Sequence, residues 1–398
     1  MAAYDPFSRE VMADPLPFYR ALRSRGRAHS LPRYDAWALP RFDDVWHVLQ
    51  DRERFTIVEG PIFARDRLLA PNDAPLSTTV DRPIRTFSMI DPPTHTQLRR
   101  AMLPPFLPRA VATLEADVRA HVRALLDELI PRGGFDAVGE LGSPVAAAAT
   151  CRLLGVPADD HPTIVRQVNA FTRREPGEPG MSPVGRDAQV QLHRYLTEWV
   201  AGARGRGGLV DLLAAYDTGS DEPLSDQEIA VQVNTLLVGG VETLPKIVAG
   251  GLRRLWLEPD QRVDLAADPS LSANAFEEIM RLESVLQWVG RTLLVDAEVA
   301  GVEMTAGQRV FLLLVSANFD EREFPDPERF DIRRTISRTL VFGHGVHVCI
   351  GAHAARLEGR VILEELLARA PDYEIDPQGI ERPPSEFQVG YTAMPVRC

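Results

Sequence analysis

Cysteine is scarce in this chain. Cys151, Cys349 and Cys398 are the three cysteines among 398 residues, and they lie far apart. An odd number of widely spaced cysteines does not make a disulfide framework or a paired-cysteine zinc module, and it is typical of a reducing compartment. Long apolar runs are missing too, since no stretch reaches the ~18–20 uninterrupted apolar residues of a membrane span. The first residues contain an early acid, Asp5, and no apolar core, so they do not resemble a signal peptide. We therefore expect a cytoplasmic protein with no membrane partner.

The chain also has fewer basic than acidic residues, and it has no internal repeats. The 44 Lys and Arg residues are outnumbered by 56 Asp and Glu residues, and the formal net charge of −12 argues against a general nucleic-acid binder. The apolar content of 45% is that of an ordinary globular protein, which excludes intrinsic disorder. The sequence also lacks internal repeats, low-complexity linkers and a glycine-rich dinucleotide-binding motif. A chain of this length buries roughly three quarters of its unfolded surface and needs no disulfides.

Helical periodicity is the main pattern that is present. Apolar residues recur on one helix face between positions 114 and 129, and residues 189–200 and 354–368 behave in the same way. Strand-like segments are short, at residues 36–40, 292–295, 310–315 and 387–391. The sequence therefore predicts a mainly α fold with small β-sheets rather than alternating βαβ units.

The clearest single helix begins after Ser225. Ser225 and Glu228 have the spacing of a capping box, and the apolar pattern continues to about position 256, which predicts a helix roughly 45 Å long. Because this helix is apolar on most sides, it should cross the interior of the protein. Gly239, Gly240 and Pro245 interrupt it, at a cost on the order of 1 kcal/mol for each Gly and about 3 kcal/mol for Pro. Something must compensate for this cost, and a functional bend is one candidate.

Residues 342–351, with the sequence Phe-Gly-His-Gly-Val-His-Val-Cys-Ile-Gly, are the most informative segment. Its glycines permit positive φ angles and a close backbone approach around Cys349. Cys349 stands just before a helix signal, where backbone N–H groups and the helix dipole favour a thiolate. A buried structural cysteine is the ordinary interpretation of a lone Cys, but it leaves the glycines and His347 unexplained.

Two metal-binding interpretations of this segment remain. A zinc site built from His344, His347, Cys349 and His353 lacks the usual chelating pairs. The other interpretation is that Cys349 supplies a thiolate ligand to heme iron.

The segment around Cys349 resembles the heme-binding signature of the cytochrome P450 family at every defining position. The resemblance implies heme b, iron protoporphyrin IX, held by Cys349 with Phe342, Gly343 and Gly351 shaping the loop. It implies the mainly α cytochrome P450 fold, a single triangular helical domain with small β-sheets over residues 1–398 and no fused reductase or ferredoxin domain. It also implies a monooxygenase that uses O2 and electrons from a separate ferredoxin, reduced by an NAD(P)H-dependent reductase.

Four further motifs are similar to those of the family. Glu278-x-x-Arg281 resembles its structural charge pair, and Arg329 resembles the third partner of that pair. Glu242 and Thr243 resemble its acid–alcohol pair, in which Thr243 binds oxygen and Glu242 relays protons through water. Leu244 and Pro245 depart from the usual pattern that follows this pair. The residues whose resemblance implies contacts with the heme propionates are His95, Arg99, Arg291 and His347.

The substrate is expected to be a hydrophobic small molecule that is hydroxylated or epoxidised. By position in the family, the candidate pocket residues are Phe63, Leu236, Gly239, Leu286, Val289 and Phe387. For the ferredoxin, a basic docking patch is expected from Arg100, Arg109, Arg356 and Arg360. Two other functions stay open: a peroxide-driven peroxygenase, and a non-catalytic heme-binding or recruitment protein. The Glu242–Thr243 pair favours the O2-dependent reaction over both.

Overall fold

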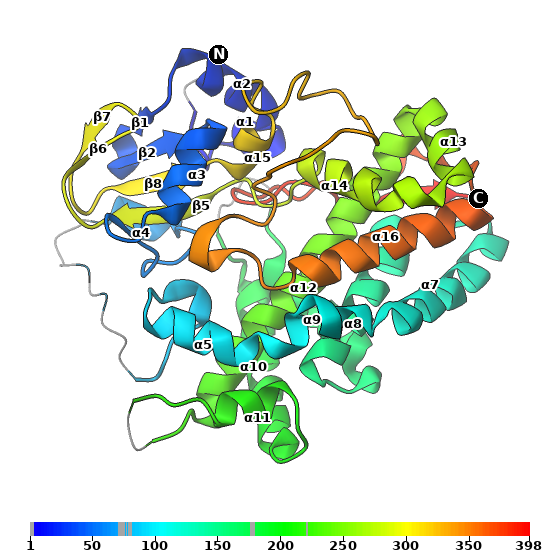
Figure 1. Cartoon of the computed structure of the whole chain (residues 1–398), viewed down its shortest axis with the longest axis horizontal. Helices are drawn as coiled ribbons and strands as arrows, with labels where there is room; N and C mark the ends of the chain where they lie inside the picture. Colours follow the sequence, from blue (N-terminus) through cyan, green and yellow to red (C-terminus); the bar gives the residue numbers. More distant parts are fainter. Residues whose placement is uncertain (1–3, 71–75, 77, 79–81, 176–179, 220–221) are drawn as a thin grey trace.

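A β-rich part near the N-terminus and a larger helical part make up the molecule (Figure 1). The structure is a computed structural model and describes residues 4–70, 76, 78, 82–175, 180–219 and 222–398. The main sheet has the strand order β1-β2-β8-β5-β3, in which β2 and β8 are parallel and the other neighbours are antiparallel. Its strands are β1 (His29–Leu31), β2 (Ala36–Leu39), β3 (Phe55–Thr56), β5 (Val289–Leu293) and β8 (Arg309–Leu312). The helices beside this sheet are α1 (Arg9–Ala13), α2 (Leu16–Arg25), α3 (Phe42–Gln50), α4 (Arg65–Leu69) and α15 (Leu314–Asn318).

Two smaller sheets complete the strand content of the described residues. The first has the order β4-β10-β9 and is formed by β4 (Gly134–Asp136), β9 (Glu374–Ile375) and β10 (Pro395–Arg397). The second pairs β6 (Ala297–Val299) with β7 (Val302–Met304). Residues 387–391, predicted as a strand, form only an isolated bridge between Gln388 and Leu286. Two backbone hydrogen bonds join the segment to residues 285–287, from Gln287 N to Phe387 O and from Val389 N to Val285 O, and the ladder does not extend beyond them.

The helical part is built around one long central helix, α12 (Asp226–Leu257). The surrounding helices are α5 (Thr94–Met102), α6 (Pro108–Ala112), α7 (Glu115–Leu129), α8 (Ser143–Leu154), α9 (His161–Thr172), α10 (Pro183–Ala203), α11 (Leu209–Ala214), α13 (Pro259–Ala267), α14 (Ser272–Leu282) and α16 (Ala352–Arg369). In Figure 1, α12 passes behind the ends of α16 and α7 and continues down toward α10. The predicted helices at 114–129, 189–200 and 354–368 correspond to α7, part of α10 and α16, which confirms the mainly α fold.

α12 crosses the interior as its apolar pattern predicts. Both halves of the capping box are present, with the Ser225 hydroxyl accepting from Glu228 N and the Glu228 carboxylate accepting from Ser225 N. By length and composition alone α12 is apolar enough to span a membrane, but 72% of its most apolar window is buried inside the protein. α12 is therefore the core helix of this fold.

The helix-breaking residues of α12 lie at close contacts with neighbouring segments. A Cβ atom at Gly240 would stand 2.3 Å from the Thr150 hydroxyl on α8, so this position needs glycine. At Gly142, which ends the π-helical turn Ala137–Gly142, a Cβ atom would stand 2.7 Å from Cα of Pro245. The neighbours thus approach α12 closely at both interruptions, and this packing offsets part of the local cost of Gly and Pro.

Candidate active site

Cys349 lies between a turn of 3₁₀ helix, Gly345–His347, and the start of α16. The loop is held by its own backbone, because Cys349 N donates to Phe342 O at 2.9 Å and Gly343 N donates to Leu340 O at 3.0 Å. Gly345 has a φ of +72°, and a Cβ atom there would stand 2.4 Å from Leu49 O on α3. Glycine is required at this position by both its backbone conformation and its packing.

Opposing effects act on the pKa of the Cys349 thiol, and their net result is to raise it. The side chain is accessible, although the surrounding protein is dense enough for desolvation to raise the pKa of the thiol. The Gly351 amide, which hydrogen-bonds the sulfur, and the charges of Arg99 and Arg356 act in the opposite direction and lower this pKa. These groups stabilise negative charge on sulfur, which is the state in which cysteine binds a metal.

Four nitrogen-rich side chains gather near this loop: His95, Arg99, Arg291 and His347. The rings of His95 and His347 have centroids 3.9 Å apart. His95 is fully buried and neither of its ring nitrogens has a hydrogen-bond partner. The Nε2 atom of His347 also has none. Arg99 Nη2 donates to Val348 O at 2.6 Å, and Arg291 Nη1 donates to the adjacent Gly290 O at 2.7 Å. Within the described residues, none of the four is in an ion pair.

Two arginines and two imidazoles, none of them in an ion pair among the described residues, are a good match for an anionic group. Burial, followed by repulsion among these groups, lowers the pKa of His95 to about 4 and that of His347 to about 2. Burial also lowers the pKa of Arg291 to about 10. Buried cations and unpaired imidazoles are costly unless an anion or acceptor meets them. The cluster, next to the accessible Cys349 sulfur, therefore fits heme b, whose two propionates would meet the cluster while Cys349 holds the iron.

The heme-free protein should lose stability in mild acid because of this cluster. The pKa of His95 is about 4 when folded and about 6.5 when unfolded, so protons bind preferentially to the unfolded chain below about pH 6.5. Its stabilising contribution is complete above pH 6.5 and declines toward pH 4. Between pH 7 and pH 5, His95 alone should cost the heme-free protein about 2 kcal/mol of unfolding free energy. Urea unfolding at the two pH values measures this loss, which should shrink in His95→Gln. An equal loss in wild type and variant would contradict it.

The surface of α12 is open at Gly239. Gly239 is exposed although it lies in the middle of a core helix, and a Cβ atom there would have no neighbour within 4 Å. One turn later, the Thr243 hydroxyl donates to Gly239 O at 2.8 Å. The hydroxyl is therefore oriented beside this open space.

The carboxylate of Glu242 is buried and has two partners. Its Oε1 atom is in an ion pair with Lys246, one turn later on α12, and its Oε2 atom accepts from Gln388 Nε2 at 2.7 Å. Only 3% of the Glu242 side chain and 8% of the Lys246 side chain are exposed. Lys246 was not among the predicted site residues, although its position four residues after an acid was a usable signal.

Glu278 and Arg281 form a fully buried bidentate ion pair on α14. Arg281 Nε and Nη2 donate to the two Glu278 oxygens at 2.7 and 2.8 Å, and Arg281 Nη1 donates to Asn318 O and Pro327 O. The Asn318 side-chain oxygen accepts from Leu340 N at 3.0 Å. The ion pair is thus connected through Asn318 to the beginning of the cysteine loop.

The third basic partner of this pair is Arg334, where the sequence analysis expected Arg329. Arg334 Nε donates to Glu278 Oε1 at 3.0 Å. Arg329 is exposed and contributes its carbonyl oxygen, which accepts from Arg334 Nη2 at 3.0 Å. The physical reason is the turn at residues 326–329, where Asp326 has a φ of +48° and Arg329 N donates to Asp326 O. This turn leaves the Arg329 side chain in solvent, and Arg334 reaches Glu278 instead.

The candidate pocket residues fall into two groups. Gly239 is exposed, and Leu286, Val289 and Phe387 are half-buried. Leu236 and Phe63 are buried, with 7% and 4% of their surfaces exposed. The Phe63 ring stacks on Trp288 with centroids 6.0 Å apart and meets Phe311 edge-on at 5.2 Å. Phe63 is therefore part of an aromatic core cluster. The half-buried Leu286, Val289 and Phe387 are the better candidates for substrate contact.

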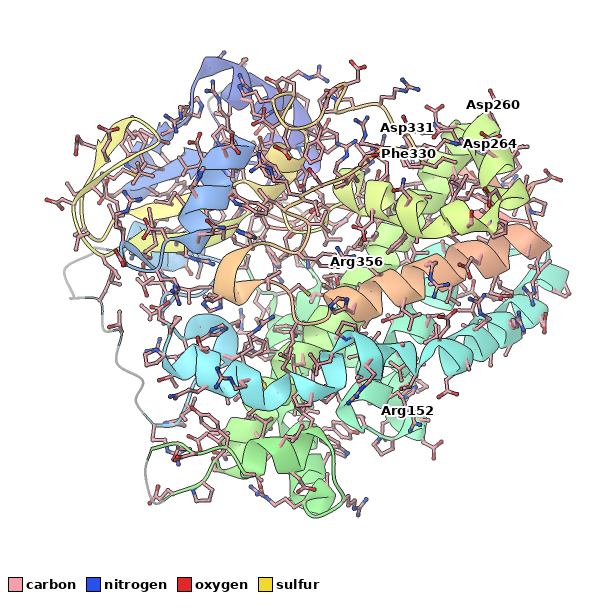
Figure 2. All side chains as sticks on the ribbon, viewed as in Figure 1. Arg152, Asp260, Asp264, Phe330, Asp331 and Arg356 are labelled. Carbon is pink, nitrogen blue, oxygen red and sulfur yellow. The ribbon has the colours of Figure 1, made fainter. Side chains whose placement is uncertain are left out.

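Two of the four arginines in the expected docking patch are already paired. Arg356, at the start of α16 in Figure 2, is in an ion pair with Glu277, and Arg360 pairs with Glu115 and Glu364. Arg100 and Arg109 are exposed, and neither has an ion-pair partner in the described part of the chain. α5, which carries Arg100, contacts the cysteine loop through Arg99, and α6, which carries Arg109, packs against α16.

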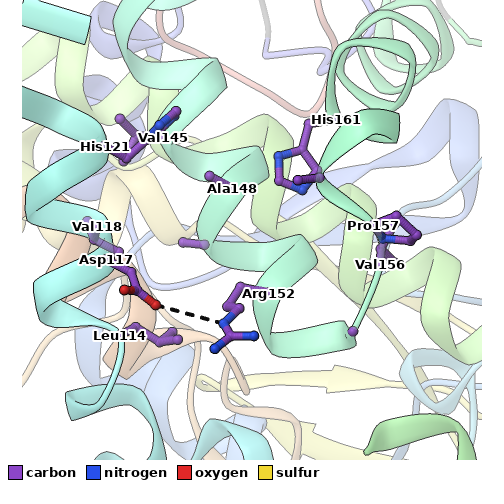
Figure 3. A pocket seen from close by; sticks show the side chains of 13 residues that line it. Leu114, Asp117, Val118, His121, Val145, Ala148, Arg152, Val156, Pro157 and His161 are labelled. Carbon is purple, nitrogen blue, oxygen red and sulfur yellow. Dashed lines mark ion pairs between the residues drawn. The ribbon is translucent and has the colours of Figure 1, made fainter. Parts of the chain in front are cut away.

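A separate hollow of about 380 Å³ lies between α7, α8 and α9 (Figure 3). Asp117 and Arg152 stand 3.9 Å apart at this hollow, and His121 and His161 are among its other lining residues. Neither Cys349 nor Thr243 lines it. This hollow is therefore distinct from the candidate active site.

Comparisons with known proteins bear on the family and the fold of this chain. The sequence model of the family described as Cytochrome P450 matches residues 196–395. The Cytochrome P450 monooxygenase PikC of Streptomyces venezuelae is 33% identical over 98% of this chain and 92% of its own length. The Vitamin D(3) 25-hydroxylase of Pseudonocardia autotrophica is 34% identical over 93% of this chain and 89% of its own. The structure of a mutant of P450 EryK in complex with erythromycin B superimposes with a TM-score of 0.84 at 28% identity, covering 98% of this chain and 97% of that one.

These relatives span nearly the whole chain, and the solved P450 structure shares its fold. The accessible Cys349 beside the cluster of two arginines and two histidines suits the heme that such proteins bind. The chain belongs to the cytochrome P450 family and is a heme-dependent monooxygenase.

Proposed function

We propose that this monooxygenase uses O2 and electrons from a separate ferredoxin to hydroxylate or epoxidise a hydrophobic small molecule in the cytoplasm. The observation that carries the proposal is the Thr243 hydroxyl, held by Gly239 O at 2.8 Å beside open space on α12, with the acid Glu242 adjacent in sequence. Bound heme, with Cys349 as its thiolate ligand, supplies the oxygen-activating chemistry. The polypeptide has to place the substrate, exclude water and provide protons.

The roles of individual residues follow from their positions. Thr243 is proposed to donate a hydrogen bond toward oxygen in the open space, after giving up its bond to Gly239 O. Glu242 is proposed to supply the proton, because it is the nearest acid in sequence and is shielded from bulk water. His95, Arg99, Arg291 and His347 are proposed to neutralise the heme propionates.

The substrate class is inferred from the apolar pocket candidates and from two relatives. Leu286, Val289 and Phe387 offer apolar surface that is only half-buried. One relative is named as a hydroxylase of vitamin D(3), and one similar structure contains erythromycin B. A bulky, mostly apolar molecule is therefore the proposed substrate of this chain.

Oxygen uptake distinguishes this function from its two rivals. The holoenzyme is mixed with a [2Fe–2S] ferredoxin, its reductase and NADPH, and oxygen consumption is compared with oxidation of the same apolar test compounds by hydrogen peroxide alone. The proposal predicts NADPH-dependent oxygen uptake that requires the ferredoxin. A peroxygenase would oxidise substrates with peroxide and show no ferredoxin-dependent uptake. A non-catalytic heme protein would do neither.

The ferredoxin is proposed to dock over the cysteine loop beside Arg100 and Arg109. Because neither arginine has an ion-pair partner among the described residues, both remain free to meet an acidic partner. Arg100→Glu with Arg109→Glu should slow heme reduction by ferredoxin at least about tenfold at low salt and should weaken its dependence on ionic strength. Stopped-flow reduction under carbon monoxide measures both. Arg206→Glu, at an exposed position between α10 and α11, is the matched control. Equal rates and salt dependence in the double variant and the control would contradict this docking site.

A further inference from the structure

Lys246 is chemically exceptional in this chain. It is the only lysine among 398 residues, so every other basic side chain among the 44 Lys and Arg residues is arginine. It is also buried in the middle of the core helix, with 8% of its side chain exposed. Unlike arginine, a buried lysine can lose its proton near neutral pH. Burial, and after it repulsion from Arg174, act to lower the pKa of Lys246, and the ion pair with Glu242 is the contact that favours its charged form.

The contacts of Glu242 leave its carboxylate no free oxygen. Oε1 is engaged by Lys246, and Oε2 by Gln388. No hydrogen bond joins Glu242 to Thr243 among the described residues, and the Thr243 hydroxyl is directed to Gly239 O. In this arrangement the acid and the alcohol are adjacent in sequence but engaged by different partners.

The segment that carries Gln388 is fixed independently of Glu242. Gln388 N donates to Ser385 Oγ at 3.2 Å, and Gln388 O accepts from Gln287 Nε2 at 3.1 Å. At Gly390, where φ is +121°, a Cβ atom would stand 3.0 Å from Lys246 Cβ. The loop therefore packs directly on the lysine stem.

The other charged groups near this site form their own pair. Arg174, in the segment after α9, pairs with Glu386 at 3.3 Å, and these side chains are 10% and 5% exposed. The Arg174 guanidinium also lies 4.9 Å from the centre of the Phe387 ring. Because Glu386 already balances Arg174, Lys246 is the cation that balances Glu242.

We propose that Lys246 is a positioning residue that holds the Glu242 carboxylate ionised and turned toward Gln388, so that Glu242 can take up a proton and reach Thr243 only when this ion pair opens. The proposal rests on the proton-relay role proposed above for Glu242. A buried carboxylate that loses its cationic partner is protonated at higher pH, because the charged form is no longer stabilised. Lys246 thereby determines the pH range in which the relay acid carries a proton.

Infrared difference spectroscopy of the holoenzyme tests the charge state directly. Comparison of wild type with Glu242→Gln isolates the Glu242 carboxyl band. The protonated band should be absent from wild type at pH 7 and present in Lys246→Met, which keeps the apolar stem on Gly390. Lys246→Arg, which retains a cation, should again lack it. The proposal is overturned by a protonated band in wild type at pH 7, by its absence from Lys246→Met, or by equal bands in the Met and Arg variants. If Lys246→Met does not bind heme, Lys246→Gln, which also lacks the positive charge, takes its place in the comparison.

The pH profile of oxygen consumption gives the functional readout. Oxygen consumption is measured with ferredoxin, reductase and NADPH but no added substrate, and it falls at low pH along the acid limb of the profile. The midpoint of this acid limb should shift to a pH more than one unit higher in Lys246→Met. In Lys246→Arg it should lie at its wild-type pH. Arg206→Met, which removes an exposed cation outside α12, is the control and should leave the limb in place. An unchanged limb in Lys246→Met would also overturn the proposal. If Glu242→Gln itself leaves oxygen consumption unaltered, the relay role fails, while the infrared comparison still decides the charge state.

Discussion

Cys349→Ser is expected to abolish the strongly red-shifted Soret band that the reduced protein forms with carbon monoxide. A serine hydroxyl is far less acidic than a thiol and cannot supply the same electron density to heme iron. Loss of a residue that only hydrogen-bonds to a metal ligand typically lowers activity or metal affinity about 10–100-fold. Loss of the ligand itself should therefore reduce NADPH-dependent turnover by more than about 100-fold. Absorption spectra and oxygen consumption of the purified variant measure the two effects.

Cys398→Ser provides the control for this experiment. Cys398 is an exposed thiol near the C-terminus, so its replacement should leave the spectrum and the turnover unchanged. If the red-shifted band persisted in Cys349→Ser, Cys349 would not be the iron ligand, and only the fold assignment would still hold.

Arg281→Leu should produce the largest loss of stability of any single substitution considered for this protein. It leaves Glu278, which is fully buried, without its bidentate partner. Removing one member of a buried ion pair costs about 3–5 kcal/mol, because the remaining charge is uncompensated. For a chain of this size that corresponds to a fall in Tm of roughly 4–6 °C. Because Arg281 and Asn318 connect to Leu340, heme retention should fall as well. Thermal unfolding and the heme-to-protein absorbance ratio measure these losses.

Substitutions of Arg334 and Arg329 test which arginine is the third partner of Glu278. Arg334→Leu removes the third partner of Glu278 and should also destabilise the protein, but less, since Arg334 is 12% exposed and solvent can replace part of its contact. Arg329→Leu alters an exposed side chain and should change the unfolding free energy by less than about 0.5 kcal/mol. If the Arg329 variant were as unstable as the Arg334 variant, the assignment of Arg334 to this network would be wrong.

The sequence by itself predicted the features that depend on local pattern. The helical periodicity, the capping box of Ser225 and Glu228 and the course of α12 follow from short-range rules of apolar spacing and hydrogen bonding. The glycines around Cys349 and the position of the cysteine before a helix are local as well. For that reason the fold class, the family and the heme could be predicted before any contact was known.

Only the tertiary structure decided which distant side chains meet. The partner of Glu278 is Arg334 because a turn at residues 326–329 leaves Arg329 in solvent. Phe63 is part of an aromatic cluster with Trp288 and Phe311, which lie more than two hundred residues away in sequence. Gln388 reaches Glu242 because its loop is fixed to residues 285–287, and no local pattern encodes that contact. Pairings of this kind depend on how several segments pack at once, so they are determined by the folded core and not by the spacing of residues along the chain.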